Sequence, residues 1–297
     1  MDLQPGGTLS AYLRKAAAEI NALLERVIEP LAATPAVLHD AERYALLAPG
    51  KRLRGVTVLA CAEMFRGERA AALPFAAAVE MVHASSLVLD DLPSMDDATL
   101  RRGQTTLHRV HGEANAILAA VSYLTRAFEL LAGNVAVAAG VRAEAALRLA
   151  RAVGHDGLIG GQVADLEATG TRLELGELEY IHAHKTGALF MASAELGALA
   201  AGARRSEIES VQSFAKNLGL AFQITDDLLD ITGAPETMGK DAGKDRDKTT
   251  FVDVCGSVGA HRLVDELIDS ATASLEGFGA SAGRLRDLAE MVRRRDR

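Results

Sequence analysis

Residues 83–103 read HASSLVLDDLPSMDDATLRRG, in which an apolar helical stretch is followed directly by four aspartates, Asp90, Asp91, Asp96 and Asp97. Two arginines come next in the chain. Without neutralisation, carboxylates this dense at the end of a hydrophobic segment would repel one another and lose hydration. A hard divalent cation bound to the carboxylate oxygens removes that cost, and it leaves the arginines for an anion. The stretch therefore predicts a site for magnesium and a diphosphate.

The composition favours a helical protein with a sizeable core. Of the 297 residues, 49% are hydrophobic, whereas aromatics make up only 4% and tryptophan is absent. This bias favours helices over a β-sandwich. The formal net charge of −8 argues against a nucleic-acid-binding surface. The two cysteines, Cys61 and Cys255, form neither a metal-ligand spacing nor a disulfide framework, so a reducing compartment is expected.

The beginning of the chain carries no targeting signal. The first residues, MDLQPGGTLS, lack the basic and apolar regions of a secretory signal. No uncharged run approaches the roughly 20 residues that are needed to cross a bilayer. We therefore expect a cytoplasmic protein without a transmembrane segment.

Apolar residues recur at helical spacing along most of the chain. The pattern predicts helices at 9–31, 36–47, 55–66, 71–91, 113–132, 141–153, 175–201, 205–232, 258–275 and 282–294. The Gly- and Lys-rich segment 233–249 is predicted to form a loop. Because no repeat or useful alternating strand pattern is present, the economical prediction is one all-α domain over residues 1–297.

A second aspartate cluster lies in the segment FQITDDLLD, residues 222–230. In a helix, Asp226, Asp227 and Asp230 project toward one side, because their spacings are three and four residues. One interpretation is a helix face that is salt-bridged to the lysines that follow. Two such clusters in apolar helices favour another interpretation, which is a pair of facing carboxylate groups that bind magnesium together with substrate phosphates.

A basic cluster at residues 51–54, KRLR, precedes a predicted helix. It is either an exposed charged turn or a phosphate clamp, since free N–H groups and the helix dipole favour anions there. Magnesium that grips a diphosphate makes it a leaving group. The residues near the aspartates are apolar, so the organic group attached to the diphosphate should be a hydrocarbon chain. Loss of diphosphate from an allylic chain leaves a carbocation, which must be shielded from water. These residues therefore indicate diphosphate ionisation followed by carbon–carbon bond formation.

From Gly50 to about Phe251, the motifs resemble those of the trans-isoprenyl diphosphate synthases, the family of farnesyl and geranylgeranyl diphosphate synthases. The first cluster matches the family's DD-x4-D motif, and the second matches DDxxD. The resemblance implies a bundle of antiparallel helices around a deep central cavity, a homodimer, and three Mg²⁺ per active site. The metal ligands that it implies are Asp90, Asp91, Asp96, Asp226, Asp227 and Asp230.

Further motifs of the resemblance imply substrate contacts. The GKRxR motif implicates Lys51 and Arg54 in binding the diphosphate of isopentenyl diphosphate, and Arg102 belongs to the same side. The resemblance implies that Arg101 and Lys185 of the KTG motif bind the diphosphate of the allylic substrate, and that Lys185 is also catalytic. The other matching positions are His83, Thr186, Gln223, Lys240, Asp245 and Lys248.

The implied reaction is ionisation, condensation and elimination. The allylic substrates would be dimethylallyl, geranyl and farnesyl diphosphate, and the leaving diphosphate would remove the proton, since no side-chain base is obvious. The sequence departs from the family at Gly55, where proline is usual, and at 117–121, which lacks the usual Gly-Asp. The second departure and the close spacing of Asp245 and Lys248 are similar to bacterial carotenoid-type geranylgeranyl diphosphate synthases.

Product length depends on the depth of the cavity below Asp90. Ser85 and Ser86 lie about one helical turn, or about 5.4 Å, before the aspartates. Farnesyl synthases commonly carry an aromatic residue here, so two serines predict growth past C15 to C20, and an aromatic at Ser85 should shorten the product. Ordinary small-residue helix packing is the alternative. Candidates for a deeper floor are Met81, Val82, Leu118 and Val121.

Several other functions stay open from the residues. A farnesyl or longer-chain synthase has the same chemistry. A terpene cyclase normally has a different second metal motif, a non-catalytic subunit tends to lose aspartates, and a di-iron bundle needs Glu-x-x-His pairs that are not found. The run Arg293–Arg295 is interpreted as a solvated end, with a lid over the substrate as the alternative.

Overall fold

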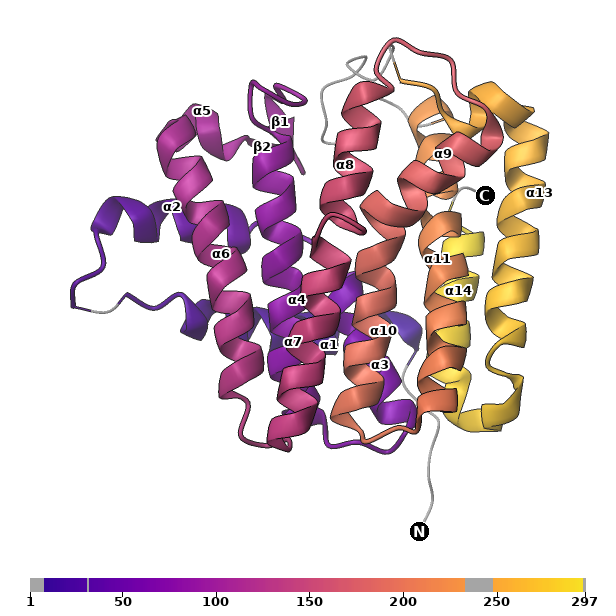
Figure 1. The fold of residues 1–297 in the computed structure, drawn as a ribbon, viewed down its shortest axis with the longest axis horizontal. Helices are drawn as coiled ribbons and strands as arrows, with labels where there is room; N and C mark the ends of the chain where they lie inside the picture. The colour runs from indigo at the N-terminus through magenta and orange to yellow at the C-terminus, as the bar shows by residue number, and fades with distance from the viewer. Residues whose placement is uncertain (1–7, 31, 233–247, 296–297) are drawn as a thin grey trace.

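Long helices that stand side by side make up most of the structure (Figure 1). The computed structural model describes residues 8–30, 32–232 and 248–295. The first helices are α1 (Leu9–Val27), α2 (Ala36–Leu46), α3 (Leu53–Met64), α4 (Arg69–Asp90), α5 (Leu107–His111), α6 (Glu113–Gly133) and α7 (Ala139–Val153). They are followed by α8 (Leu158–Glu167), α9 (Leu175–His182), α10 (Ala188–Ala200), α11 (Arg205–Thr232), α13 (Phe251–Ala273) and α14 (Gly283–Arg293).

Three smaller elements complete the fold. A π-helix, η1 (Ala183–Gly187), joins α9 to α10, and a 3₁₀ helix, η3 (Glu276–Ala282), precedes α14. Two short antiparallel strands, β1 (Leu100–Arg101) and β2 (Gln104–Thr105), form a hairpin between α4 and α5. The prediction of an all-α fold is confirmed, since this hairpin is the only sheet in the described part of the chain.

The central helices are α4 and α10, which are buried on nearly every side. α4 contacts α1, α3, α6 and α10, and α10 also contacts α3, α7 and α11. The outer helix α1 instead buries one stripe, Ala16, Ile20 and Leu24, as expected of an amphipathic helix. At Gly197 in α10, a Cβ would lie 2.2 Å from the carbonyl oxygen of Val58, so glycine is required for α3 and α10 to pack closely.

The structure differs from the predicted elements at several places, and one of them is α8, which none of the predicted helices covers. The predicted helix 175–201 is interrupted by η1, a π-helical turn of the kind that is frequent at functional sites. The predicted helix 258–275 begins earlier, at Phe251, with a kink at Gly256, whose φ of 71° is non-helical. The hairpin and α5 were not predicted, because elements of two to five residues carry no measurable period.

Two helices, α4 and α6, are long and apolar enough to cross a membrane by length and composition alone. Within the most apolar part of α4, 67% of the residues are buried inside the protein, whereas the corresponding share for α6 is 33%. The apolar character of α4 therefore matches its place in the core. The outer face of α6 keeps Ile117, Leu118 and Val121 exposed.

Candidate active site

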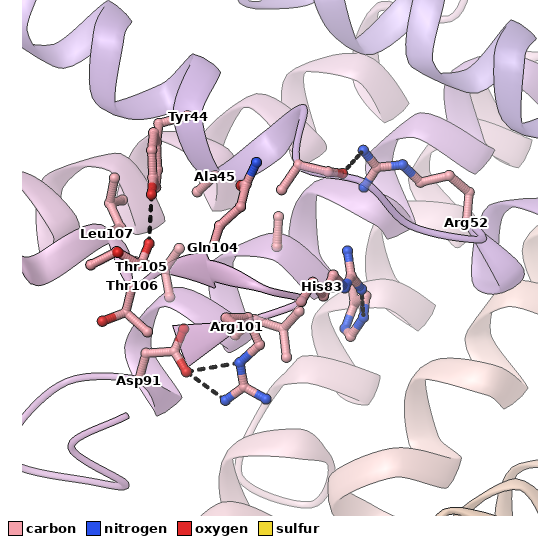
Figure 2. A pocket seen from close by; sticks show the side chains of 15 residues that line it. Tyr44, Ala45, Arg52, His83, Asp91, Arg101, Gln104, Thr105, Thr106 and Leu107 are labelled. Atoms are coloured by element: carbon pink, nitrogen blue, oxygen red, sulfur yellow. Dashed lines mark hydrogen bonds and ion pairs between the residues drawn. The ribbon is translucent and has the colours of Figure 1, made fainter. Parts of the chain in front are cut away.

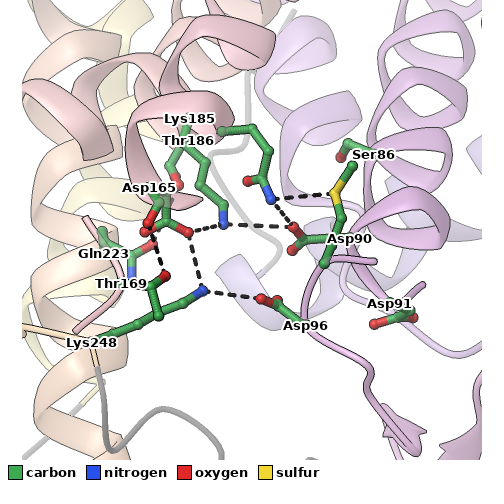
Figure 3. A network of polar contacts seen from close by, with 12 residues as sticks. Ser86, Asp90, Asp91, Asp96, Asp165, Thr169, Lys185, Thr186, Gln223 and Lys248 are labelled. Atoms are coloured by element: carbon green, nitrogen blue, oxygen red, sulfur yellow. Dashed lines mark hydrogen bonds and ion pairs between the residues drawn. The ribbon is translucent and has the colours of Figure 1, made fainter. Parts of the chain in front are cut away.

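The first aspartate cluster lies where α4 ends and the chain turns back. The backbone N–H of Asp96 donates to the carbonyl oxygen of Asp90 over 3.0 Å, and the N–H of Asp97 donates to that of Leu92 over 3.0 Å. This turn places the carboxylates of Asp90 and Asp96 toward the same pair of lysines (Figure 3). Asp97 instead pairs with Arg109 over 3.3 Å at the surface.

The two lysines, Lys185 and Lys248, bridge these carboxylates to Asp165 on α8 (Figure 3). Lys185 Nζ lies 2.8 Å from Asp165 Oδ2 and 3.7 Å from Asp90 Oδ1. Lys248 Nζ lies 3.1 Å from Asp165 Oδ2 and 3.1 Å from Asp96 Oδ1. Burial raises the pKa of Asp90, and Lys185 opposes that rise. The two lysines therefore offset part of the negative charge of the first cluster.

Arg101 and Arg102 are adjacent in sequence but contact different groups. Arg102 and Gly103 both have positive φ, 55° and 76°, as a two-residue turn of type I′ requires between β1 and β2. Arg101 in β1 donates from Nε and Nη2 to Asp91 Oδ1 over 2.8 and 2.5 Å. The hairpin thus directs Arg101 to the first aspartate cluster and Arg102 toward His83.

The anion cluster is the set of basic residues Lys51, Arg54, His83 and Arg102. Arg54 and Arg102 both contact His83, and Lys51 lies just before α3 in the chain. Arg54 Nη1 lies 3.2 Å from His83 Nε2, and Arg102 Nη2 lies 3.4 Å from the same atom. The Arg54 guanidinium also lies 4.7 Å from the ring centroid of Phe190, and its buried Nε has no hydrogen-bond partner.

The lowered pKa values of Arg54 and His83 fit a buried group of positive charges that nearby carboxylates balance only in part. Burial, offset only in part by Glu80, lowers the pKa of Arg54 to about 10. Burial and the neighbouring Arg54 and Arg102 hold the pKa of His83 well below its usual value, so its imidazole is neutral at pH 7. Unpaired donors and crowded positive charge favour binding of an anion such as a diphosphate.

Within the KRLR segment, the side chain of Arg52 is used to hold helices together. Its Nε donates to Asn21 Oδ1 over 2.8 Å, and its Nη2 donates to the carbonyl oxygens of Leu46 and Ala48 over 2.7 and 3.1 Å. Only 4% of Arg52 is exposed. Arg52 therefore joins α1, α2 and α3, and it is the flanking Lys51 and Arg54 that remain for a ligand.

The unusual Gly55 also has a structural explanation. Its backbone N–H donates to Glu80 Oε1 over 2.9 Å, and Glu80 is buried. A Cβ at Gly55 would lie 2.8 Å from Ile20 Cδ1 and 3.1 Å from the carbonyl oxygen of Ala76. Proline at this position would remove the donor and crowd α1 and α4, so the replacement of the usual proline fits the packing of this chain.

The second aspartate cluster lies on α11, and its three carboxylates have different surroundings. Asp227 accepts hydrogen bonds from the Phe251 backbone N–H over 2.9 Å and from Gln223 Nε2 over 3.1 Å. Burial raises the pKa of Asp227 to about 6. Asp230 is exposed. A hydrogen bond of 3.3 Å from Thr186 Oγ1 to Gln223 Oε1 connects this cluster to η1.

The carboxyl-terminal arginines contact acidic groups, so the interpretation of the whole run as a solvated end is wrong. Arg293 pairs with Asp269 and Asp265 on α13. Arg295 Nη1 lies 2.5 Å from Asp226 Oδ1, and its guanidinium lies 4.8 Å from the ring centroid of Phe222. Arg294, by contrast, is largely exposed.

A pocket between α2, α4 and the hairpin adjoins both sets of charges (Figure 2). Its wall includes Asp91 and Arg101 on one side and His83 and Arg102 on the other. The Tyr44 hydroxyl donates to the carbonyl oxygen of Thr105 over 2.7 Å and ties α2 to the hairpin. Arg101 and Arg102, which are adjacent on the hairpin, thus contact the first aspartate cluster and the anion cluster, respectively.

The two aspartate clusters do not form a closed metal cage. Within residues 8–30, 32–232 and 248–295, no three His, Cys, Asp or Glu side chains converge on one point. The carboxylates of Asp90, Asp91, Asp96 and Asp226 face lysine or arginine instead. This donor set fits magnesium, which takes one or two carboxylates together with phosphate oxygens and water.

Two residues near the first cluster, Gln162 and Asp165, were not among the functional candidates from the sequence. Gln162 Nε2 donates to Asp90 Oδ1 over 2.6 Å, and Asp165 holds the two lysines. Their spacing of three residues on α8 was the available signal, since it places them on one helix face. Lys240 and Asp245 lie outside the described residues.

The candidate chain-length residues point in different directions. Ser86 lies four residues before Asp90 on the same face of α4, and it is partly exposed. Ser85 is buried, and its hydroxyl donates to the Ala120 carbonyl oxygen of α6 over 2.8 Å. The floor candidates Met81 and Val82 are buried, but Leu118 and Val121 are 57% and 50% exposed, so they do not form a floor within one chain.

Comparison with known proteins identifies relatives over nearly the whole chain. A family model described as polyprenyl synthetase matches residues 35–255. The chain is 42% identical to the chloroplastic geranylgeranyl pyrophosphate synthase of Capsicum annuum over 290 residues, which are 96% of this chain and 78% of the relative. It is 41% identical to the farnesyl diphosphate synthase of Geobacillus stearothermophilus over 293 residues, 97% of this chain and 98% of the relative.

Solved structures of prenyl synthases also match nearly the whole chain. An FPP/GFPP synthase from Zymomonas mobilis superposes with a TM-score of 0.87 and 34% identity, covering 96% of this chain and 98% of that one. A geranyltransferase from Helicobacter pylori, solved with magnesium and isoprenyl diphosphate, superposes with a TM-score of 0.86 and 28% identity, covering 97% of each chain.

Proposed function

The chain belongs to the polyprenyl synthetase family and is a trans-prenyltransferase, and from this premise we propose that it condenses isopentenyl diphosphate with allylic diphosphates to give geranylgeranyl diphosphate. The observation that carries the proposal is that the β1–β2 hairpin directs its two adjacent arginines to different charged sites, Arg101 to Asp91 and Arg102 toward His83. One site combines carboxylates with lysines, and the other, the anion cluster, is basic. A reaction between two diphosphates needs such a pair of sites.

Magnesium would be held by six of the aspartates, with three ions as the proposed number; the six are Asp90, Asp91, Asp96, Asp226, Asp227 and Asp230. When bound, it neutralises the allylic diphosphate and assists its departure. Lys185, Lys248, Arg101 and Gln223 are proposed to bind that diphosphate, with the help of Thr186 and, in the segment beyond the described residues, Lys240. Lys51, Arg54, His83 and Arg102 are proposed to bind isopentenyl diphosphate.

The bond changes balance without a side-chain base. The allylic C–O bond breaks, the double bond of isopentenyl diphosphate forms a new C–C bond with the allylic cation, and a proton leaves to the released diphosphate. His83 Nε2 lies within hydrogen-bond distance of Arg54 and Arg102 in the anion cluster. Guanidinium groups can only donate, so the neutral imidazole accepts a hydrogen bond through Nε2. Phe190 and Phe222 pack together with ring centroids 5.5 Å apart, and this apolar pair is proposed to help exclude water from the cation.

A product of C20 is supported by the small side chain of Ser86 on the face of Asp90. The relatives include both geranylgeranyl and farnesyl synthases at nearly equal identity, so C15 or a longer chain is the alternative. A cytoplasmic location is proposed from the composition and from the two free cysteines, Cys61 and Cys255. The proposal takes residues 1–297 as one polyprenyl synthase domain.

A homodimer is proposed, with α6 at the interface. Ile117, Leu118 and Val121 recur on one face of α6 and are 42%, 57% and 50% exposed. Apolar residues at this spacing on the outside of a helix favour burial against a second copy. Light scattering of the wild-type protein and of Leu118→Glu would test this, since the charged residue should favour the monomer.

One assay tests the activity. Purified protein, Mg²⁺ and isopentenyl diphosphate are incubated with each allylic diphosphate in turn, and the products are sized after dephosphorylation. We expect a C20 product, and C15 alone would favour the farnesyl alternative. Asp90→Ala and Asp226→Ala should remove nearly all turnover and keep the helical circular dichroism, whereas the exposed Asp156→Ala should behave as wild type. No prenyl product from any starter would contradict the proposed function.

A further inference from the structure

Helix α8 lies directly against the backbone that carries Lys185. A Cβ at Gly161 would lie 2.3 Å from the backbone nitrogen of Lys185 and 2.8 Å from its Cα, so only glycine permits this approach. The contact falls on η1, where the helix has a π-helical turn. The position of Lys185 is therefore set by α8 as well as by its own helix.

Asp165 lies on the same face of α8, four residues after Gly161. Its Oδ2 accepts hydrogen bonds from Lys185 Nζ over 2.8 Å and from Lys248 Nζ over 3.1 Å (Figure 3). Lys185 comes from η1 and Lys248 from the segment just before α13. One carboxylate oxygen thus brings together two ammonium groups from segments that are far apart in the chain.

The burial and charge of Asp165 suit this role. Only 12% of its side chain is exposed, so its bonds to the lysines are shielded from water. Burial alone would raise the pKa of Asp165, but Lys185 and Lys248 lower it below the usual value, so the group is ionised at neutral pH. Two like-charged ammonium groups held by the same oxygen would otherwise separate.

Asp165 belongs to neither aspartate-rich cluster, yet each lysine lies between it and a carboxylate of the first cluster. Lys185 is 3.7 Å from Asp90, and Lys248 is 3.1 Å from Asp96. If Asp90 and Asp96 bind magnesium, as proposed, Asp165 remains as the carboxylate partner of both lysines. Charge-assisted hydrogen bonds of this kind fix direction as well as energy.

We propose that Asp165 is a positioning residue that holds Lys185 and Lys248 side by side as donors to the allylic diphosphate. This inference rests on the proposed function and adds to it a residue outside the aspartate-rich motifs. Asp165 does not touch the substrate; it acts through the two ammonium groups. Isopentenyl diphosphate binds elsewhere, at the anion cluster, so its binding is independent of Asp165.

The test compares Asp165→Asn with Asp156→Asn, a matched change at an exposed carboxylate just before α8. Asp165→Asn is expected to raise KM for the allylic diphosphate by about tenfold, and to change KM for isopentenyl diphosphate by less than about twofold. Calorimetric titration with inorganic diphosphate and Mg²⁺ should show the same weakening without turnover. Asp156→Asn should match wild type in every measurement.

Two further variants make the result specific. Asp165→Glu restores the charge and should recover part of the allylic KM, which a purely structural loss would not explain. In a double-mutant cycle, Lys248→Met should weaken allylic binding less in the Asp165→Asn background than in wild type. If circular dichroism shows that Asp165→Asn is not folded, Asp165→Glu replaces it, and its displaced carboxylate should still raise the allylic KM alone.

The outcomes separate this inference from the proposed function. Absence of prenyl product from the wild-type protein would overturn the proposed function. Normal wild-type turnover with an unchanged allylic KM in Asp165→Asn, or with equal changes in both KM values, would overturn only the positioning role of Asp165.

Discussion

Arg295 Nη1 lies 2.5 Å from Asp226 Oδ1, so an arginine near the carboxyl end of the chain neutralises a carboxylate of the second aspartate cluster. The guanidinium also stacks over Phe222 on the same helix, α11. Burial and the charge of Arg295 together lower the pKa of Lys51 in the anion cluster. Arg295 therefore lies near both Asp226 and Lys51, and its contact with Asp226 would compete with a metal ion there.

The first prediction concerns this competition. Arg295→Ala should lower the Mg²⁺ concentration for half-maximal activity by about threefold, since a partly exposed ion pair is worth roughly 0.5–1 kcal/mol. Arg294→Ala is the matched control, because Arg294 is largely exposed and pairs with Glu290 of its own helix. The measurement is a magnesium titration of initial rates. A higher magnesium requirement, together with a raised KM for isopentenyl diphosphate, would show instead that Arg295 assists substrate binding.

Product length should respond differently to the two serines. Ser86→Phe places a ring on the face of Asp90, one turn below it, and should shift the product from C20 toward C15. Ser86→Ala keeps the space and should leave the product at C20. Ser85→Phe must also break the hydrogen bond to Ala120 and press on α6, so it should lower the unfolding midpoint. Chromatography measures the product length, and thermal melts measure the unfolding midpoint. An unchanged C20 product from Ser86→Phe would show that Ser86 does not limit the length of the product.

The stability of the metal-free protein should depend on the ionisation of Asp227. Burial raises its pKa to about 6, above the usual value for an aspartate, so folding favours the protonated form. The folded state is then fully stabilised below the unfolded pKa, and this contribution is lost as the pH rises from about 4 through about 6. Asp227→Asn should therefore unfold at a higher urea concentration than wild type at pH 7.5, by on the order of 2 kcal/mol.

That difference should nearly vanish at about pH 3, below the unfolded pKa, where the wild-type carboxyl is protonated in both states. The experiment is done in EDTA so that bound metal does not compensate the charge. Asp253→Asn is not a suitable control, since it would break the capping box of α13, whereas the exposed Asp156→Asn changes charge alone. Equal stabilities of wild type and Asp227→Asn at both pH values would contradict the burial of an ionised group.

Gly55→Pro, which restores the residue usual in the family, should destabilise this chain. The substitution removes the N–H that donates to the buried Glu80, and it crowds Ile20. Leaving a buried carboxylate oxygen unpaired costs on the order of 1–3 kcal/mol. The check is a urea unfolding curve, and a more stable Gly55→Pro variant would show that Glu80 finds another donor.

The sequence by itself determined the helical fold and most of the charged groups. Apolar residues at helical spacing predicted the long helices, because a helix that buries one face needs that period whatever it packs against. The density of aspartates at 90–97 and 226–230 indicated cation binding for a similarly local reason, since neighbouring carboxylates repel unless they are neutralised.

The tertiary structure alone decided which charges meet. Asp165, Lys185 and Lys248 come from three segments, and no local pattern states that one carboxylate oxygen will hold both lysines. The divergence of Arg101 and Arg102 depends on a two-residue turn with positive φ, and the contact of Arg295 with Asp226 depends on how α14 packs. A helical period reports which face of a segment is buried; the partner across that face is set by packing between segments distant in the chain.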